Sequence, residues 1–269
     1  YIHPTAIIDP GAELEPRVAI GPYVVIGPQV FVGEGTHIGP HAVIEGYTRI
    51  GKNSTIHTGA VIGGVPQDYK FQDAPSYVEV GNHTLIREYV TVHRSSEVGG
   101  KTVVGDHCFL MAYTHVAHDC QVGDHVVITN YTGLSGYVIV EDQAIISGYV
   151  AVHQFVRIGK LAMISAQSGL SKDVAPYMIV EGRPCVVRGI NAIGLRRAGI
   201  SARSRSNLKK AYHFLFLSGL NTSDALIRIK DEGEMGEEVS HLVRFIEGSK
   251  RGIHKARGQE AAEEPVSDL

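Results

Sequence analysis

The stretch "AYTHVAHDCQVGDH", residues 112–125, places His115, His118 and His125 close to Asp119 and Cys120. Side chains of these types can bind a metal ion, transfer a proton as a general base, or act as a nucleophile. Because spacing means different things on a helix and on a strand, the backbone that carries these residues decides among the three chemistries.

A large aliphatic residue occupies every sixth position from Ile8 to Leu170, and only Asp68 and Ala74 break the series. On a helix, six residues advance by about 600°, which would spread the series over three faces. A strand keeps all even-spaced residues on one side. We therefore predict short strands joined by tight corners, three per coil. This is a parallel β-helix of about 18 residues per coil, with Gly, Asn and Asp at corners where φ can be positive.

Two stretches interrupt this pattern in the predicted β-helix domain, residues 1–187. Residues 63–79 break the aliphatic series, whereas residues 94–103 keep its phase at Val98 but read as a Gly/Ser loop. Long loops on a rigid scaffold often carry function, and a tolerated insertion is the alternative.

After Pro184 the period changes, which predicts an α-helical domain over residues 188–252 and a disordered tail over residues 253–269. Residues 188–230 carry nine basic side chains and one acidic one, Asp224. This surface is either a solvated face or a docking surface for an acidic protein or a phosphate-bearing ligand.

The composition narrows the functional classes. Lys plus Arg number 25 and Asp plus Glu 28, a balance that gives no indication of nucleic-acid binding. Three cysteines are too few for a disulfide framework and indicate a reducing cytoplasm. The sequence has no apolar run long enough for a transmembrane segment, and its start does not resemble a signal peptide.

An 18-residue coil stacks residues 18 apart, roughly 4.8 Å from one another. His118, Gly136 and Gln154 then form one column, with Asp119, Tyr137 and Phe155 beside it. A neutral imidazole can take a proton from a hydroxyl, and a nearby backbone N–H can stabilise an oxyanion. The column therefore favours acyl transfer, with inert surface histidines as one alternative.

Zinc is the other alternative. His115 and His118 would share one face of a helix, but on this solenoid they lie at different points of one coil. Thiolates in close pairs, which structural zinc sites favour, are absent from the sequence. We therefore expect no metal site.

Five motifs, "VPQDYK", "IREYVTVHR", "HVAHDCQVG", "AVHQF" and "INAIGLRRAGI", resemble the UDP-N-acetylglucosamine acyltransferases that begin lipid A synthesis. The resemblance extends to about residue 250. It implies a left-handed β-helix and a homotrimer with active sites between neighbouring prisms. It also implies transfer of a 3-hydroxyacyl chain from acyl carrier protein to the sugar 3-hydroxyl. The carrier thioester is a co-substrate, and no cofactor is implied.

The resemblance assigns roles by position: His118 is the general base, Asp119 polarises it, and Gly136 supplies the oxyanion-hole N–H. Cys120 is then a small buried residue and no nucleophile. The positions that match substrate contacts are Asp68, Lys70, His93, His115, Tyr137, His153, Gln154, Ala166, Asn191 and Arg197. The acidic carrier protein would meet Arg196, Arg197, Arg203, Arg205, Lys209 and Lys210.

This sequence departs from the family at several places near the substrate. Tyr137 stands where histidine is common, "HRSSEVGG" replaces a glycine-bearing segment, and Ile193 and Ala198 replace a glutamate and an arginine. Ala166 lies where the family measures acyl length. A related hexapeptide acyltransferase remains an alternative, acting on another sugar nucleotide (including a 3-amino sugar) or using acetyl-CoA. A zinc lyase or a non-catalytic scaffold is a third class.

Overall fold

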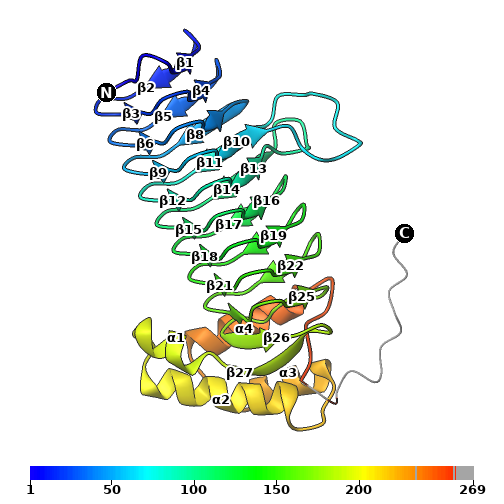
Figure 1. Ribbon diagram of the computed structural model, residues 1–269. Helices are drawn as coiled ribbons and strands as arrows, with labels where there is room; N and C mark the ends of the chain where they lie inside the picture. The colour runs from blue at the N-terminus through cyan, green and yellow to red at the C-terminus, as the bar shows by residue number, and fades with distance from the viewer. Residues whose placement is uncertain (234, 257, 259–269) are drawn as a thin grey trace.

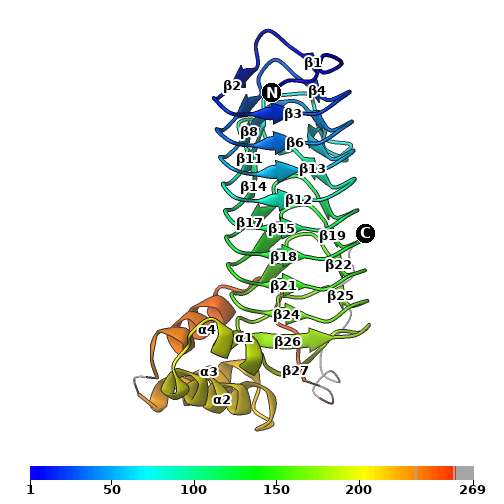
Figure 2. The same ribbon diagram turned by 60° about the vertical axis from the view of Figure 1, so that its left-hand side comes forward.

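The computed structural model describes residues 1–233, 235–256 and 258. Short strands wind into a three-sided prism, and helices cover its C-terminal end (Figure 1). Seen from a second side, the coils stack in register along the whole prism (Figure 2). No helix within the described residues combines the length and apolarity needed to cross a bilayer.

Each side of the prism is one sheet. The first contains β1 (Ile7–Ile8), β4 (Val25–Ile26), β7 (Val43–Ile44), β10 (Val61–Gly64), β13 (Thr91–His93), β16 (His115–Val116), β19 (Gly133–Leu134), β22 (Ala151–Val152) and β25 (Gly169–Leu170). The second contains β2 (Glu13–Leu14), β5 (Phe31–Val32), β8 (Tyr47–Ile50), β11 (Tyr77–Val80), β14 (Lys101–Val104), β17 (Gln121–Val122), β20 (Ile139–Val140) and β23 (Arg157–Ile158).

The third sheet continues beyond the prism into a hairpin. It contains β3 (Ala19–Ile20), β6 (His37–Ile38), β9 (Thr55–Ile56), β12 (Leu85–Ile86), β15 (Phe109–Leu110), β18 (Val127–Ile128), β21 (Ile145–Ile146), β24 (Met163–Ile164), β26 (Met178–Glu181) and β27 (Val186–Ile190). Strand pairing is parallel throughout, except for the antiparallel pair β26–β27.

The six-residue series forms the core, as predicted. In β15 and β16, Leu110 and Val116 are fully buried, whereas Phe109 and His115 point outward. His115 pairs with Gly133 and Gly133 with Ala151, which confirms the 18-residue coil. Burying one large aliphatic side chain per strand contributes about 1.5–3 kcal/mol each.

Val98 was expected in phase but is 78% exposed, so that part of the prediction is wrong. Contacts between coils span 18 residues where the winding is regular, 30 across the first interruption and 24 across the second. The second interruption is therefore a six-residue insertion, and its length alone keeps Val98 in phase. The loop covers residues 94–100, because β14 begins at Lys101.

The prediction for the corners is confirmed in part. Gly35, Gly59 and Asn53 have positive φ as expected, but most of the non-glycine residues with positive φ are Tyr, His or Phe; Tyr113, Tyr131 and Tyr149 have φ near 60°. Their rings stack on neighbouring coils with centroids 5.0 Å apart. Stacking of about 0.5–1.5 kcal/mol per pair offsets much of the roughly 1–2 kcal/mol cost of the left-handed backbone. Glycine also serves close packing: a Cβ on Gly51 would lie 2.6 Å from the Gly81 backbone.

The C-terminal domain begins with the β26–β27 hairpin, so residues 188–190 are strand rather than helix. Its helices are α1 (Ala192–Arg197), α2 (Ala202–Phe216), α3 (Thr222–Asp231) and α4 (Glu237–Glu247). Arg157 fixes α4 to the prism, because its guanidinium lies 4.1 Å from the Phe245 ring centroid and donates to the Phe245 carbonyl at 3.3 Å.

The start of the predicted disordered tail is packed. Ile253 and Ala256 are buried and form bridges to Asp173 and Val187, because the returning chain covers the last coil and the hairpin. Residues 257 and 259–269 of the predicted tail lie outside the described residues.

Candidate active site

His118 and Asp119 occupy the corner between β16 and β17. His118 Nδ1 lies 2.9 Å from Asp119 Oδ2, and the two side chains are only 12% and 9% exposed. A hydrogen bond from Nδ1–H to the carboxylate selects the tautomer whose Nε2 carries the lone pair. The pair thus presents a fixed base to the outside of the corner.

Hydrogen bonds hold the Asp119 carboxylate in its charged form. Oδ1 accepts a short hydrogen bond from Ser95 Oγ, and Oδ2 accepts from the Ser96 N–H at 3.0 Å and from Ser96 Oγ at 2.8 Å. Burial raises the pKa of Asp119, but the hydrogen bonds from Ser95, His118 and Ser96 together outweigh it and leave the pKa below its usual value.

Gly136 lies directly against the imidazole. A Cβ built on Gly136 would be 2.5 Å from His118 Cε1 and 2.7 Å from Nε2. Within the described residues, no hydrogen bond uses the Gly136 N–H. The predicted alignment of residues 118 and 136 on adjacent coils is confirmed, and only a residue without a side chain fits at 136.

His93 and His115 form the neighbouring part of the site. Their rings meet edge to face with centroids 4.8 Å apart, and His115 Nδ1 bonds Thr91 Oγ1 at 2.7 Å. Burial, with a smaller repulsion from His93 and His118, lowers the pKa of His115 to about 4. Burial, with a smaller repulsion from His118, also lowers the pKa of His93. Both imidazoles are therefore neutral near pH 7, and His93 Nδ1 is buried with no partner in the described residues.

Aromatic and polar residues of the next two coils lie around His118. The Tyr137 ring meets His118 edge to face with centroids 5.3 Å apart and stacks on Phe155 at 4.8 Å. His153 and Gln154 are exposed on the next coil, where His153 Nδ1 lies 3.1 Å from the Gln154 carbonyl oxygen.

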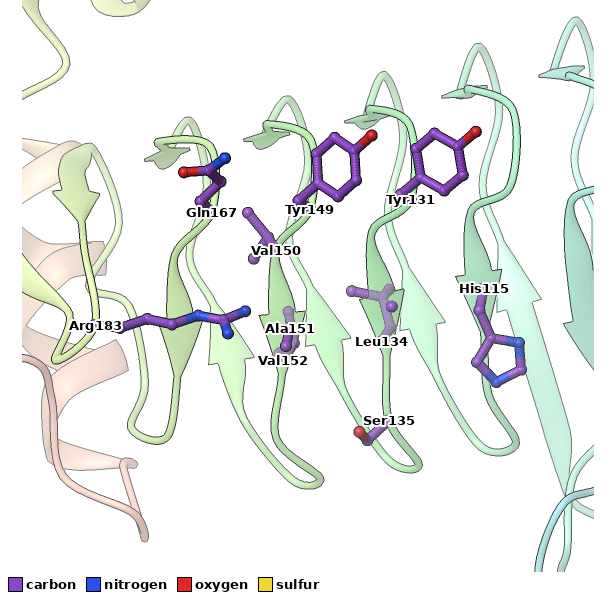
Figure 3. A pocket seen from close by; sticks show the side chains of 11 residues that line it. His115, Tyr131, Leu134, Ser135, Tyr149, Val150, Ala151, Val152, Gln167 and Arg183 are labelled. Carbon is purple, nitrogen blue, oxygen red and sulfur yellow. The ribbon is translucent and has the colours of Figure 1, made fainter.

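A groove of about 720 Å³ runs along the outside of the first sheet from His115 to Arg183 (Figure 3). The small residues Gly133 and Ala151, which pair on adjacent strands, line it. The Tyr131 and Tyr149 rings lie along one side (Figure 3). Across the three strand spacings from β16 to β25, it is roughly 14 Å long. Arg183 reaches across its far end and lies over Gly169, where a Cβ would approach the arginine side chain to 3.2 Å.

Asp68 and Lys70 lie on the loop after β10, which projects from the prism (Figure 1). The Asp68 carboxylate accepts a hydrogen bond from the Lys70 N–H at 2.9 Å, and no hydrogen bond or ion pair among the described residues joins either side chain to His118. The loop is held by an ion pair of 2.6 Å between Asp73 and Arg94. The predicted contacts of Asp68 and Lys70 with the sugar therefore stay predictions.

Asn191 is buried at the start of α1. Its Oδ1 accepts from the Gly194 N–H and its Nδ2 donates to the Leu161 carbonyl, both at 2.9 Å. These bonds give Asn191 a structural role as the N-cap of α1, and its predicted nucleotide contact stays a prediction. Ala166 is exposed at a corner beside the groove residue Gln167.

The predicted carrier-docking residues lie together on two helices. Arg196 and Arg197 are exposed at the end of α1, and α2 carries Arg203, Arg205, Lys209 and Lys210. Within the described residues, Lys210 pairs with Glu232 at 3.7 Å, and Arg205 donates to the Ile200 carbonyl. The other four form no ion pair there.

Two residues of the site, Ser95 and Ser96, were missed as contacts of Asp119. The signal was present, because the unusual "RSS" opens an insertion one coil away from His118. Only the 24-residue offset across that insertion shows that Ser95 and Asp119 lie on adjacent coils.

Cys120 is fully buried and donates its S–H to the Ser135 carbonyl at 3.1 Å. Burial raises its pKa to about 12, which leaves no thiolate at neutral pH. Within residues 1–233, 235–256 and 258, no group of three or more His, Cys, Asp or Glu side chains is arranged to hold a metal ion. The hydrogen-bonded pair of His118 and Asp119, called the dyad below, is the candidate reactive group of this corner.

Comparison with known proteins identifies the family. Residues 173–254 match the family described as UDP N-acetylglucosamine O-acyltransferase, Domain 2, and residues 29–64 and 101–136 match the bacterial transferase hexapeptide repeat. An acyl-(acyl-carrier-protein)–UDP-N-acetylglucosamine O-acyltransferase of Syntrophobacter fumaroxidans is 47% identical over 254 residues, which are 94% of this chain and 98% of the relative. One from Thermodesulfovibrio yellowstonii is 48% identical over the same shares of both chains.

Solved structures agree with the sequence relatives. The UDP-N-acetylglucosamine acyltransferase of Bacteroides fragilis has a TM-score of 0.92 and 43% identity, covering 94% of this chain and 99% of its own. The Francisella novicida enzyme has the same TM-score at 33% identity and full coverage of both chains. The fold is the left-handed parallel β-helix with a helical C-terminal domain, and this chain belongs to the acyl-(acyl-carrier-protein)–UDP-N-acetylglucosamine O-acyltransferase family.

Proposed function

We propose that this chain transfers a 3-hydroxyacyl group from acyl carrier protein to the 3-hydroxyl of UDP-N-acetylglucosamine, the first step of lipid A synthesis. Family membership supports the reaction class. The observation that carries the chemistry is the buried His118–Asp119 pair set against Gly136, beside a long groove. The reaction needs no cofactor, because the thioester supplies the activated acyl group.

The proposed mechanism uses one base and one backbone donor. His118 Nε2 removes the proton of the sugar hydroxyl as its oxygen attacks the thioester carbonyl carbon. The negative charge that develops on the carbonyl oxygen is stabilised by the Gly136 N–H. When the tetrahedral intermediate collapses, the C–S bond breaks. The His118 imidazolium then donates the proton, which it took from the sugar hydroxyl, to the leaving thiolate.

The groove is the proposed site of the acyl chain. It begins at His115, in the coil of the dyad, and the small residues Gly133 and Ala151 that line it leave room for a chain lying across the strands. Burying apolar methylenes there contributes about 0.8 kcal/mol each. Arg183 closes the far end, so groove length would limit the length of the acyl chain.

The basic residues of α1 and α2 are the proposed docking surface for the carrier protein. Arg196, Arg197, Arg203 and Lys209 are exposed and form no ion pair within the described residues. An acidic partner would be attracted most strongly by positive charges that no acidic side chain of this chain compensates. Because exposed charges are screened within about 10 Å at 0.1 M salt, the KM for the carrier should rise with ionic strength.

We also propose a homotrimer in the cytoplasm. Ile7 and Val25, outward residues of the first sheet, are 67% and 38% exposed, as expected of surfaces that another copy covers. The projecting loop with Asp68 and Lys70 could then serve a neighbouring site. Free thiols at Cys108, Cys120 and Cys185 agree with a reducing compartment. Light scattering after size exclusion tests the trimer.

Mass spectrometry of the product tests the reaction. Wild type and His118→Ala are incubated with UDP-N-acetylglucosamine and 3-hydroxyacyl carrier proteins of several lengths, with acetyl-CoA as the alternative donor. The base variant should lose about 10²- to 10⁴-fold in kcat. His125→Ala, on an exposed corner of the same stretch, is the matched control and should retain activity. Wild type that uses only acetyl-CoA, or an active His118→Ala, would contradict the proposal.

A further inference from the structure

We infer that Ser96, together with Ser95 and Tyr137, positions the Asp119–His118 pair, so that the 94–100 loop is part of the catalytic machinery. This inference rests on the proposed function and adds positioning residues to it. None of the three needs to touch a reacting atom, because each acts through Asp119 or through the ring of His118.

The first support is the number of donors on one carboxylate. Asp119 accepts hydrogen bonds from Ser95 Oγ, from the Ser96 N–H at 3.0 Å and from Ser96 Oγ at 2.8 Å, besides the His118 bond. The bonds lie on both oxygens, so they fix the rotation of the carboxylate as well as its position. A fixed carboxylate in turn fixes the ring plane and tautomer of His118.

The second support is Tyr137, which connects the imidazole to the loop. Its hydroxyl lies 3.1 Å from Ser96 Oγ and donates to Glu97 Oε1 at 2.7 Å. Its ring meets His118 edge to face and stacks on Phe155. Ser96 Oγ–H donates to Asp119, and Tyr137 has a single hydroxyl proton, so Ser96 Oγ and Glu97 Oε1 are alternative acceptors that share this proton. One tyrosine therefore holds both the ring of the base and the serine that orients its partner.

The third support is that the same loop is bonded to the loop carrying Asp68 and Lys70. Ser76 Oγ donates to the Ser95 carbonyl at 2.6 Å, and the Gly99 N–H donates to the Pro75 carbonyl at 2.8 Å. Residues 94–100 thus form a continuous hydrogen-bonded connection between the projecting loop and Asp119. A displacement of the projecting loop would be passed to the dyad through Ser95.

The test separates kcat from KM. Ser96→Ala keeps the backbone N–H bond but removes the hydroxyl from Asp119 and Tyr137. A hydrogen bond to a charged group of this kind corresponds to about a ten-fold loss in kcat, and the KM values of both substrates should stay within about two-fold. Ser96→Thr retains the hydroxyl and should restore kcat. Ser223→Ala, an exposed serine on α3, is the matched control.

A double-mutant cycle tests whether Ser96 acts through Asp119. In an Asp119→Ala background, Ser96→Ala should cause no further loss in kcat, because the group it orients is gone. Tyr137→Phe should lose about three-fold alone and less in combination with Ser96→Ala, since the two hydroxyls share a contact. Thermal unfolding of each variant confirms that it is folded.

The outcomes distinguish the inference from the proposed function. If wild type is active and folded Ser96→Ala keeps full kcat, the positioning role is wrong. It is also wrong if Ser96→Ala lowers kcat equally in the wild-type and the Asp119→Ala backgrounds. A loss confined to KM, or no rescue by Ser96→Thr, would overturn it as well. A wild type that does not acylate UDP-N-acetylglucosamine at all would instead refute the proposed function.

Discussion

Adding a single methyl group at Gly136 should disable the dyad while leaving the coil intact. The Cβ of Gly136→Ala would lie 2.5 Å from His118 Cε1, whereas ordinary contacts begin at 3.4 Å. The imidazole must therefore retreat by about 1 Å, and a misplacement of that size costs about 10²-fold in rate. The backbone N–H remains, so the loss would report on displacement of the base rather than on loss of the oxyanion donor.

The assay is single-turnover acyl transfer at saturating substrate, with thermal unfolding measured in parallel. Gly189→Ala is the matched control, because a Cβ there meets nothing within 4 Å. The control should keep wild-type turnover. A folded Gly136→Ala enzyme with turnover within about two-fold of wild type would show that His118 does not need its present position, and the proposed mechanism would fail.

Cys120→Ala should keep turnover within about two-fold, because the buried thiol is protonated; a folded but inactive variant would point to a nucleophile. Arg183→Ala should lengthen the preferred acyl chain in a competition of carrier thioesters, whereas Arg188→Ala, ion-paired with Glu181, should not. Burial lowers the pKa of His254 to about 4, so the unfolded chain binds a proton more readily and stability falls as the pH drops from about 6.5 toward 4. His254→Gln should reduce the dependence of the unfolding free energy on pH, measured by urea unfolding, by up to about 1.4 kcal/mol per pH unit. An unchanged pH dependence would contradict the buried neutral imidazole.

The sequence determined the coil and the first members of the site. A period of six with aliphatic residues leaves one regular solution, because only extended backbone keeps even-spaced side chains on one side. The 18-residue coil then placed His118 beside Gly136 and Tyr137 beside Asp119, since no insertion separates these coils.

Insertions in the coil limited how many of the other site contacts the sequence could predict. Ser95 and Ser96 reach Asp119 only through an offset of 24 and 23 residues, which the regular coil does not predict. Val98 kept the phase by coincidence, because an insertion of six residues cannot be distinguished from one more repeat. The prediction for the corners was incomplete, because stacking between coils also allows tyrosine and histidine, besides Gly, Asn and Asp, at positive φ.

What the sequence by itself determined is therefore the periodic scaffold and the column of residues it carries at constant spacing. Only the tertiary structure decided which loops close onto that column, how Asp119 is held, that Asn191 caps a helix, and that Arg183 ends the groove. The physical reason is that strand periodicity is a local property of the backbone. Contacts across insertions and between domains depend on side chains that are distant in sequence and meet only after the coils have stacked.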